Sequence, residues 1–220
     1  MENNTAKQRY KGFFITFEGP EGSGKSTQAR KLAEFLTAKG REVLLTREPG
    51  GTPLAELLRK LVKNFEGEEV MHADTELLLI EAARVQHVQE KILPALQSGK
   101  VVICDRFADS TTAYQGGARG IDPDSIAFLN RLAMAQCVPD LTFLLDLPPN
   151  IGFARANERK ETKGEHDRFE EEQLNFHLRV RNAFLAIAER EPSRMRLINA
   201  DRDPDTIYQE IRAIADKLVR

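Results

Sequence analysis

The chain has little of what marks several large classes of protein. Its 220 residues include two cysteines, too few for a disulfide scaffold or a cysteine zinc site. No apolar run approaches the ~18 residues that a membrane-spanning helix requires. The polar start of the chain lacks the hydrophobic core of a signal peptide, and residues 1–11 are expected to form a loose leader. These absences predict a cytoplasmic protein.

Neither sign of charge dominates the sequence. Lysine and arginine total 32 against 34 acidic residues, so the formal net charge is -2 and no overall attraction to nucleic acid or to an anionic membrane is expected. The chain also has no internal repeat and no linker rich in proline, glycine or serine. We therefore expect a single domain over residues 1–220.

Short apolar runs alternate with segments of helical periodicity along the chain. That alternation is typical of an α/β fold, in which helices cover a parallel sheet on both faces. The expected strands are Phe13–Glu18, Glu42–Thr46, Val101–Asp105, Leu141–Asp146 and Arg196–Asn199.

Helix boundaries carry their own signals. Gly40 is expected to end the first helix, and Pro94 is expected to kink or end the long helical segment Thr75–Gln97. Three other helices are expected to begin at a capping side chain followed by proline, in the pairs Thr52-Pro53, Asp122-Pro123 and Asp203-Pro204.

The strongest local signal follows the first expected strand. Residues 19–26 fit the pattern G-x-x-x-x-G-K-[ST] between a strand and a helix, the context in which backbone N–H groups bind the phosphates of a nucleoside triphosphate. Lys25 is expected to reach the β- and γ-phosphates and Ser26 to bind Mg²⁺. The predicted nucleotide-binding residues are Gly19, Pro20, Glu21, Gly22, Ser23, Gly24, Lys25, Ser26 and Thr27.

The third expected strand ends in an acid followed by a base. The two GTPase motifs D-x-x-G and N-K-x-D are absent, and the adjacent acids usual in motor and transport ATPases are replaced by Asp105 and Arg106. Asp105 suits the Mg²⁺ shell, and Arg106 indicates a second anion nearby. Glu21 would repel phosphate, so we expect it to point toward a Mg²⁺-bound water or a hydroxyl of a second substrate. The pattern favours phosphoryl transfer between two phosphate-bearing substrates over hydrolysis.

Further segments are typical of an acceptor site. Arg47 and Glu48 follow the second strand, and ligands of parallel sheets bind beyond the carboxyl ends of the strands. Arg84 lies among small residues of the long helix. Because arginine can bind a phosphate through two hydrogen bonds, Arg84 and Arg106 are candidates to hold an acceptor monophosphate.

In combination, these segments resemble the thymidylate kinase family of nucleoside monophosphate kinases. The resemblance covers the chain from about Phe13 to its end, and the run Ala-Tyr-Gln-Gly-Gly at 113–117 is its most specific part. It rests on residues 19–26, 46–52, 82–84, 105–120, 167–170 and 179–181. It implies a P-loop three-layer α/β fold, with a five-stranded parallel sheet flanked by helices and a small helical lid at about 150–168. It also implies Mg²⁺-dependent transfer of the ATP γ-phosphoryl group to dTMP, and a homodimer.

The resemblance further implies a role for each acceptor residue. Arg84 would hold the thymine carbonyl edge or the acceptor phosphate, and Arg106 would hold the acceptor phosphate. Tyr114 would crowd the position of a ribose 2′-hydroxyl, and Glu21 would face the acceptor sugar and the metal shell. The other implied contacts are Arg47, Glu48, Pro49, Ile80, Ser110, Thr111 and Gln115, of which Thr111 and Gln115 would line the base.

Catalysis is expected to depend on positioning and on charge stabilisation. No general base is required, because the attacking phosphate oxygen is already an anion. Lys25 is the only base in the phosphate loop, so Arg155 and Arg159 are expected to close over the phosphates from the lid. The predicted catalytic set is Lys25, Asp105, Arg106, Arg155 and Arg159.

Two alternatives stay open at this point. Ile80 stands where the family often has a phenylalanine that stacks on thymine, which leaves room for a kinase of another nucleoside or deoxynucleoside monophosphate. A catalytically silent nucleotide-binding protein is the second alternative, although it would need no acceptor clamp. The four histidines show no ligand spacing and are expected to be surface or helix residues, and Cys104 is expected to pack inside its strand.

Overall fold

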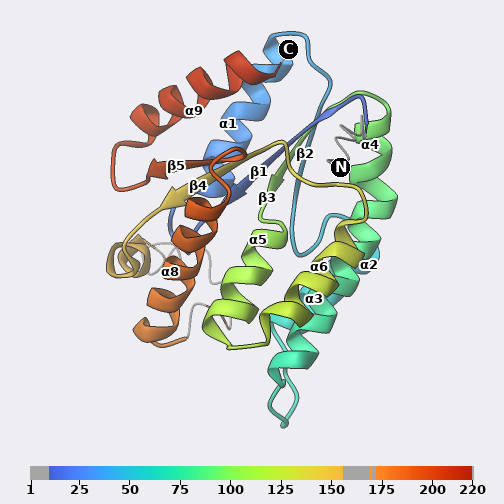
Figure 1. The fold of residues 1–220 in the computed structure, drawn as a ribbon, viewed down its shortest axis with the longest axis vertical. Helices are drawn as coiled ribbons and strands as arrows, with labels where there is room; N and C mark the ends of the chain where they lie inside the picture. Colours follow the sequence, from blue (N-terminus) through green and yellow to red (C-terminus); the bar gives the residue numbers. More distant parts are fainter. Residues whose placement is uncertain (1–9, 156–168, 170–171, 220) are drawn as a thin grey trace, which may run out of the picture.

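A parallel sheet lies at the centre of the structure, a computed structural model that describes residues 10–155, 169 and 172–219 (Figure 1). The strand order is β2-β3-β1-β4-β5, and every neighbouring pair is parallel. Three strand predictions are confirmed to the residue, the second strand lies one residue later than expected, and the fifth begins one residue earlier. The strands are β1 (Phe13–Glu18), β2 (Val43–Arg47), β3 (Val101–Asp105), β4 (Leu141–Asp146) and β5 (Met195–Asn199).

Two helices cover one face of the sheet, α1 (Lys25–Ala38) and α9 (Pro204–Leu218). Alternation along β1 separates the two faces, since Ile15 and Phe17 pack into the cluster under α1 and α9 while Phe14 packs on the opposite side. Both clusters consist of buried side chains, which explains why the central strands β1, β3 and β4 are apolar almost throughout.

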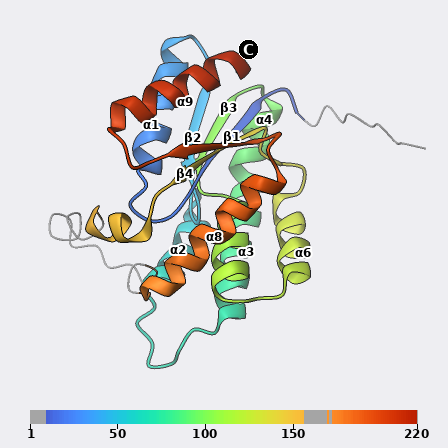
Figure 2. The same ribbon diagram turned by 60° about the vertical axis from the view of Figure 1, so that its left-hand side comes forward.

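The other labelled helices lie on the opposite face of the sheet (Figures 1 and 2). α8 packs along η2, and α3 lies between α2 and α6. A further helical segment covers residues 149–155. The labelled segments are α2 (Pro53–Lys63), α3 (Ala73–His87), η1 (Val88–Ile92), α4 (Leu93–Gln97), α5 (Ala108–Thr111), η2 (Thr112–Ala118), α6 (Pro123–Met134) and α8 (Leu174–Arg190). The predicted α/β class, with a five-stranded parallel sheet between helices, is confirmed.

All three predicted helix caps are present. The Thr52 hydroxyl accepts a hydrogen bond from the N–H of Ala55, and the Asp122 carboxylate accepts one from Ser125. The Asp203 carboxylate accepts from two backbone N–H groups of α9. Gly40, with φ of 81°, donates its N–H to the carbonyl of Thr37 and ends α1 as expected.

The long helical segment runs through Pro94 and ends at Gln97. Just before the proline the helix widens into the π-helical segment η1, in which the N–H of Leu93 reaches the carbonyl of Val88. The helix therefore passes the residue that lacks an N–H and continues as α4. Of the two outcomes expected at Pro94, a kink or an end, the helix does not end there. It runs on to Gln97, the expected end of the segment.

The expected leader and lid lie only partly within the described residues. Tyr10 donates its hydroxyl proton to the carbonyl of Val138, 2.7 Å away, so this part of the expected leader packs on the fold. Residues 1–9 and 156–168 lie outside the described residues, and Arg159 of the expected lid lies among them. Among the described helices, none is long and apolar enough to cross a membrane.

Candidate active site

The phosphate loop connects β1 to α1 and is packed too closely for larger residues. A Cβ at Gly19 would lie 2.3 Å from the carbonyl oxygen of Leu145, and one at Gly22 would lie 2.6 Å from that of Gly152. Both glycines also have positive φ, 135° and 74°. The loop is thus held against the ends of β4 and the segment after it.

Lys25 lies folded onto this loop. Its Nζ donates to the carbonyl of Pro20 at 2.7 Å and to Ser23 Oγ at 3.3 Å. Burial of the ammonium group, assisted by the positive charge of Arg106, lowers the pKa of Lys25 to about 8. The carboxylates of Glu21 and Asp105 oppose that shift.

Ser26 and Asp105 meet as their shared prediction requires. Asp105 stands opposite Phe17 in the register of β3 against β1, and the Ser26 hydroxyl donates to its Oδ2. A hydroxyl and a carboxylate at the phosphate loop are oxygen donors of the kind that Mg²⁺ accepts. Within the described residues there is no group of three or more His, Cys, Asp or Glu side chains that suits a metal ion. The pair therefore fits a cation that is also held by phosphate oxygens.

Arg106 occupies the turn directly after β3, with φ of 69°. Its Nη1 donates to the carbonyl of Gly19 and to Ser110 Oγ, both at 3.1 Å. Its Nη2 donates to Glu21 Oε1 at 2.5 Å and to the Tyr114 hydroxyl at 3.1 Å. Burial alone would lower the pKa of Arg106, but the charges of Tyr114, Glu21 and Asp105 outweigh burial and raise the pKa above its ordinary value. Arg106 therefore keeps its charge. Glu21 is thus turned toward Arg106, away from the loop's own phosphate site.

The buried carboxyl of Glu18 was missed by the sequence analysis. It accepts hydrogen bonds from the N–H groups of Phe107 and Ser110 and from the Ser110 hydroxyl. Burial, with the nearby charge of Asp109, raises the pKa of Glu18 to about 8. Its position directly before the phosphate loop was the only available signal. Glu18 fixes the turn that carries Arg106.

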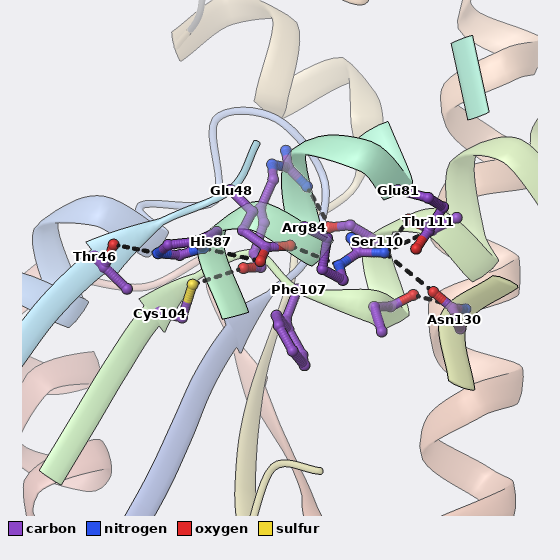
Figure 3. Close-up of polar contacts among 12 residues, drawn as sticks. Thr46, Glu48, Glu81, Arg84, His87, Cys104, Phe107, Ser110, Thr111 and Asn130 are labelled. Atoms are coloured by element: carbon purple, nitrogen blue, oxygen red, sulfur yellow. Dashed lines mark hydrogen bonds and ion pairs between the residues drawn. The ribbon is translucent and has the colours of Figure 1, made fainter. Parts of the chain in front are cut away.

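Arg84 lies at the centre of a buried polar cluster (Figure 3). Its Nε donates to Glu48 Oε2 at 2.7 Å, and its Nη1 donates to Glu81 Oε1 at 2.5 Å. Nη1 also donates to Thr111 Oγ1 and to Asn130 Oδ1, at 3.0 and 3.1 Å. Burial opposes its charge, but Glu81 and Glu48 raise the pKa of Arg84.

An aromatic wall closes the other side of the site. The Tyr114 ring packs edge-on against Phe169, Phe176 and Phe184, with centroids 5.8 to 6.2 Å apart. Next to it, the Gln115 amide donates to the buried carboxylate of Glu76 at 2.7 Å. Tyr114 and Gln115 are therefore fixed before any ligand arrives.

Residues of the phosphate loop, the end of β3, α3 and η2 line one cavity of about 1190 Å³. It contains most of the predicted site residues, namely Glu21, Gly22, Gly24, Lys25, Ser26, Thr27, Arg47, Glu48, Pro49, Ile80, Arg84, Asp105, Arg106, Ser110, Thr111, Tyr114 and Gln115. It also contains residues that the sequence analysis did not select, which are Glu56, Arg59, Lys60, Lys63, Asn64, Phe65, Glu66, Phe107 and Phe169.

Four predicted residues lie elsewhere. Gly19, Pro20 and Ser23 form the inner side of the phosphate loop and do not line the cavity. Arg155 points to the β5–α9 connection, where its Nη1 donates to the carbonyl of Ala200 at 3.1 Å.

A loop shaped for phosphate and a group of acceptor-side arginines share this cavity at the carboxyl edge of a parallel sheet. That arrangement defines a P-loop kinase with two nucleotide-sized substrates, a nucleoside monophosphate kinase. The family model described as thymidylate kinase matches residues 17–211, and the chain belongs to the thymidylate kinase family.

Individual relatives agree with the family match. A thymidylate kinase of Pseudomonas fluorescens (strain Pf-5) is 51% identical over 208 residues, covering 94% of this chain and 97% of the relative. A thymidylate kinase from Protochlamydia amoebophila is 46% identical over 205 residues, and the match covers 92% of this chain and 91% of the relative. The crystal structure of thymidylate kinase from Ehrlichia chaffeensis is 37% identical, with a TM-score of 0.74 over 92% of this chain and 98% of that one.

Proposed function

We propose that in this cavity the γ-phosphoryl group of ATP passes to dTMP, giving ADP and dTDP. As a member of the thymidylate kinase family, the protein is a nucleoside monophosphate kinase. One observation carries the assignment of the site. Lys25 of the phosphate loop and Arg106 after β3 line the same cavity, and Glu21 of the loop contacts Arg106.

On the donor side, the phosphate loop would bind the β- and γ-phosphates through its backbone N–H groups and Lys25. An incoming triphosphate offers Lys25 Nζ anionic oxygens in place of the Pro20 carbonyl. Ser26 and Asp105 would hold Mg²⁺, which when bound neutralises charge on the phosphates. The oxygen donors of this pair fit that ion.

On the acceptor side, Arg106 and Arg47 would bind the monophosphate. Arg106 is already fixed by Ser110 and the Gly19 carbonyl, so it loses little freedom on binding. The dTMP phosphate would compete with Glu21 for Arg106 Nη2, and Glu21 is then released toward the sugar.

The thymine would lie between Ile80 and the η2 segment, with Arg84, Thr111 and Gln115 at its edge. Ile80 is buried at 8% exposure and lines the cavity, so it offers an aliphatic surface to one face of the ring. Tyr114 would lie on the sugar side and would leave little room for a 2′-hydroxyl.

The chemical step requires the acceptor phosphate oxygen to attack the γ-phosphorus in line with the bond to ADP. The new bond between the acceptor oxygen and the γ-phosphorus forms while the bond between the γ-phosphorus and the β-phosphate oxygen breaks. No proton needs to be moved. Lys25 and Arg106, on opposite sides of the transferred group, would stabilise the charge that develops on its oxygens. We assign the same role to Arg155 and Arg159 of the expected lid, and Arg155 would have to leave the Ala200 carbonyl to take it.

We also propose a cytoplasmic homodimer within a single-domain architecture. Exposed apolar side chains gather on three neighbouring helices, with Leu57 of α2 58% exposed, Leu78 of α3 56% and Phe128 of α6 58%. Burial of these side chains against a second copy would remove a large apolar area from water. Cys104 and Cys137 are free thiols, in keeping with a reducing compartment.

A coupled assay of ADP production with ATP and Mg²⁺ tests the function. We expect little ADP without an acceptor and the highest kcat/KM with dTMP among dTMP, dUMP, UMP, CMP and AMP. A preference for another monophosphate would contradict the assignment of the base pocket. ATP binding without acceleration by any monophosphate would contradict phosphoryl transfer itself.

A further inference from the structure

His87 is the last residue of α3 and is completely buried. Its Nδ1 lies 3.0 Å from Glu48 Oε1, and its Nε2 lies 2.7 Å from Thr46 Oγ1 (Figure 3). The turn after β2 also closes over the ring, since a Cβ at Gly51 would lie 2.4 Å from Nε2. The imidazole therefore joins α3 to the end of β2.

Glu48 connects this ring to Arg84. One carboxylate oxygen contacts His87 Nδ1, and the other accepts from Arg84 Nε at 2.7 Å. Figure 3 shows the three side chains in a row, with Glu48 between the ring and the guanidinium group. The side chains of His87, Glu48 and Arg84 are 0%, 3% and 2% exposed, so no water competes at either contact.

The guanidinium group of Arg84 is held at two of its three nitrogens. Nε has Glu48, and Nη1 has Glu81, Thr111 and Asn130. Nη2 has no hydrogen-bond partner among the described residues, and Arg84 lines the cavity. The direction of Nη2 therefore depends on the partners of Nη1 and, at the other side of the planar group, on where the Glu48 carboxylate is held.

Both ring nitrogens of His87 take part in hydrogen bonds in this arrangement. When Nδ1 carries the proton, it donates to Glu48, and Nε2 accepts from the Thr46 hydroxyl. Removing the Nδ1 donor alone would leave the buried Glu48 carboxylate with one partner fewer and free to rotate about its last bond.

We propose that His87 is a positioning residue for the acceptor. Through Glu48 it fixes the direction in which Arg84 presents Nη2 to the cavity, and so it sets the affinity for dTMP without contacting it. The proposal rests on the role assigned to Arg84 in the proposed function.

Two amide substitutions separate the two ring contacts. In His87→Asn the amide nitrogen replaces Nδ1 and keeps the donor to Glu48. In His87→Gln the amide nitrogen lies where Nε2 was and donates to the Thr46 hydroxyl, which then accepts, so that contact is kept while the donor to Glu48 is lost. We expect His87→Gln to raise the KM for dTMP and the dTMP dissociation constant about tenfold, with the KM for ATP unchanged. His87→Asn should retain both dTMP values.

Thermal melting and two controls separate positioning from a general loss of structure. Tyr10→Phe removes a hydrogen bond far from the cavity and should lower Tm without changing either KM. Arg84→Lys should weaken dTMP binding at least as much as His87→Gln. The proposal would be overturned if His87→Asn and His87→Gln weakened the binding of dTMP equally, weakened the binding of ATP as well, and did so in proportion to their loss of Tm. Normal dTMP binding in His87→Gln beside weakened binding in Arg84→Lys would overturn it too. Normal binding in Arg84→Lys would instead overturn the role of Arg84 itself.

Discussion

At the scale of the residue, Lys25 must keep a positive charge for phosphate while its burial disfavours that charge. Its ammonium group must meet phosphate, so it stands at the start of α1 and turns back onto the phosphate loop, where it donates to the Pro20 carbonyl and to Ser23 Oγ. Its pKa of about 8 lies below the ordinary 10.5 because burial disfavours the charged form. Below pH 8 the lysine is charged in both the folded and the unfolded chain, and the desolvation cost is fully present.

Substituting Lys25 should therefore stabilise the protein at neutral pH. For Lys25→Met we expect kcat to fall by about 10²-fold or more, since a charge that stabilises the transition state is lost. The free energy of unfolding at pH 7 should rise by about 1 to 3 kcal/mol relative to the native chain. Between pH 8 and 10.5 the folded native chain loses the proton that the unfolded chain keeps, so that difference should shrink.

Denaturant unfolding of the native protein and of Lys25→Met from pH 7 to 10 measures this difference in the free energy of unfolding. Lys217→Met, at an exposed site on α9, serves as the control and should show no such trend. A difference that stays constant across that range would mean that Lys25 titrates like an exposed lysine.

The sequence predicted the residues of the site better than it predicted their partners. Motif spacing identified Ser26 and Asp105, because a strand-loop-helix pattern and a strand end fix where those side chains go. Nothing in the sequence indicated the pairing of Glu21 with Arg106 or the burial of Glu18. His87, expected to be a surface or helix residue, is a helix residue but a fully buried one. Such contacts form between segments distant in sequence, where spacing carries no information.

At the scale of the element, the approach of η2 to α8 decides where the aromatic wall lies. A Cβ at Gly117 would lie 2.5 Å from the Cβ of Ala183, closer than two such atoms pack. η2 carries Tyr114 and Gln115 into the cavity. The position of the aromatic wall therefore requires a small residue both at 117 on η2 and at 183 on α8.

A double-mutant cycle tests this packing. Gly117→Ala should destabilise the protein by about 1 to 3 kcal/mol through overpacking and should raise the KM for dTMP. Ala183→Gly alone should cost about 1 kcal/mol, because glycine is a poor residue inside a helix. The double variant should be more stable than the sum of the two predicts and should recover the KM for dTMP. Strictly additive unfolding energies would show that the two segments do not constrain each other here.

Element boundaries followed local chemistry closely. The caps at Thr52, Asp122 and Asp203 form as predicted, because each is made within a few residues of its own helix. Pro94 is the exception. The widened turn before it supplies the backbone with a different hydrogen-bond register, and single-residue preferences do not reveal such a turn.

At the scale of the whole molecule, the layer of α2, α3 and α6 is the surface that we propose as the dimer interface. Phe128 and Leu132 of α6 are 58% and 63% exposed. We expect the native chain to sediment as a dimer and Phe128→Glu to dissociate it at micromolar concentration, since a charge would have to be buried. Leu197→Glu, at a 53% exposed site on β5, should leave the dimer intact. A native chain that sediments as a monomer would refute the assignment.

The pairing of β3 with β1 has a consequence for which changes of chain length the enzyme tolerates. Phe17 stands opposite Asp105, and the phosphate loop begins two residues after Phe17. Successive side chains point to opposite faces, so inserting or deleting one residue within β3 would turn Asp105 away from Ser26. Backbone hydrogen bonds between β1 and β3 thus set the alignment of Asp105, the carboxylate that we propose as a metal ligand.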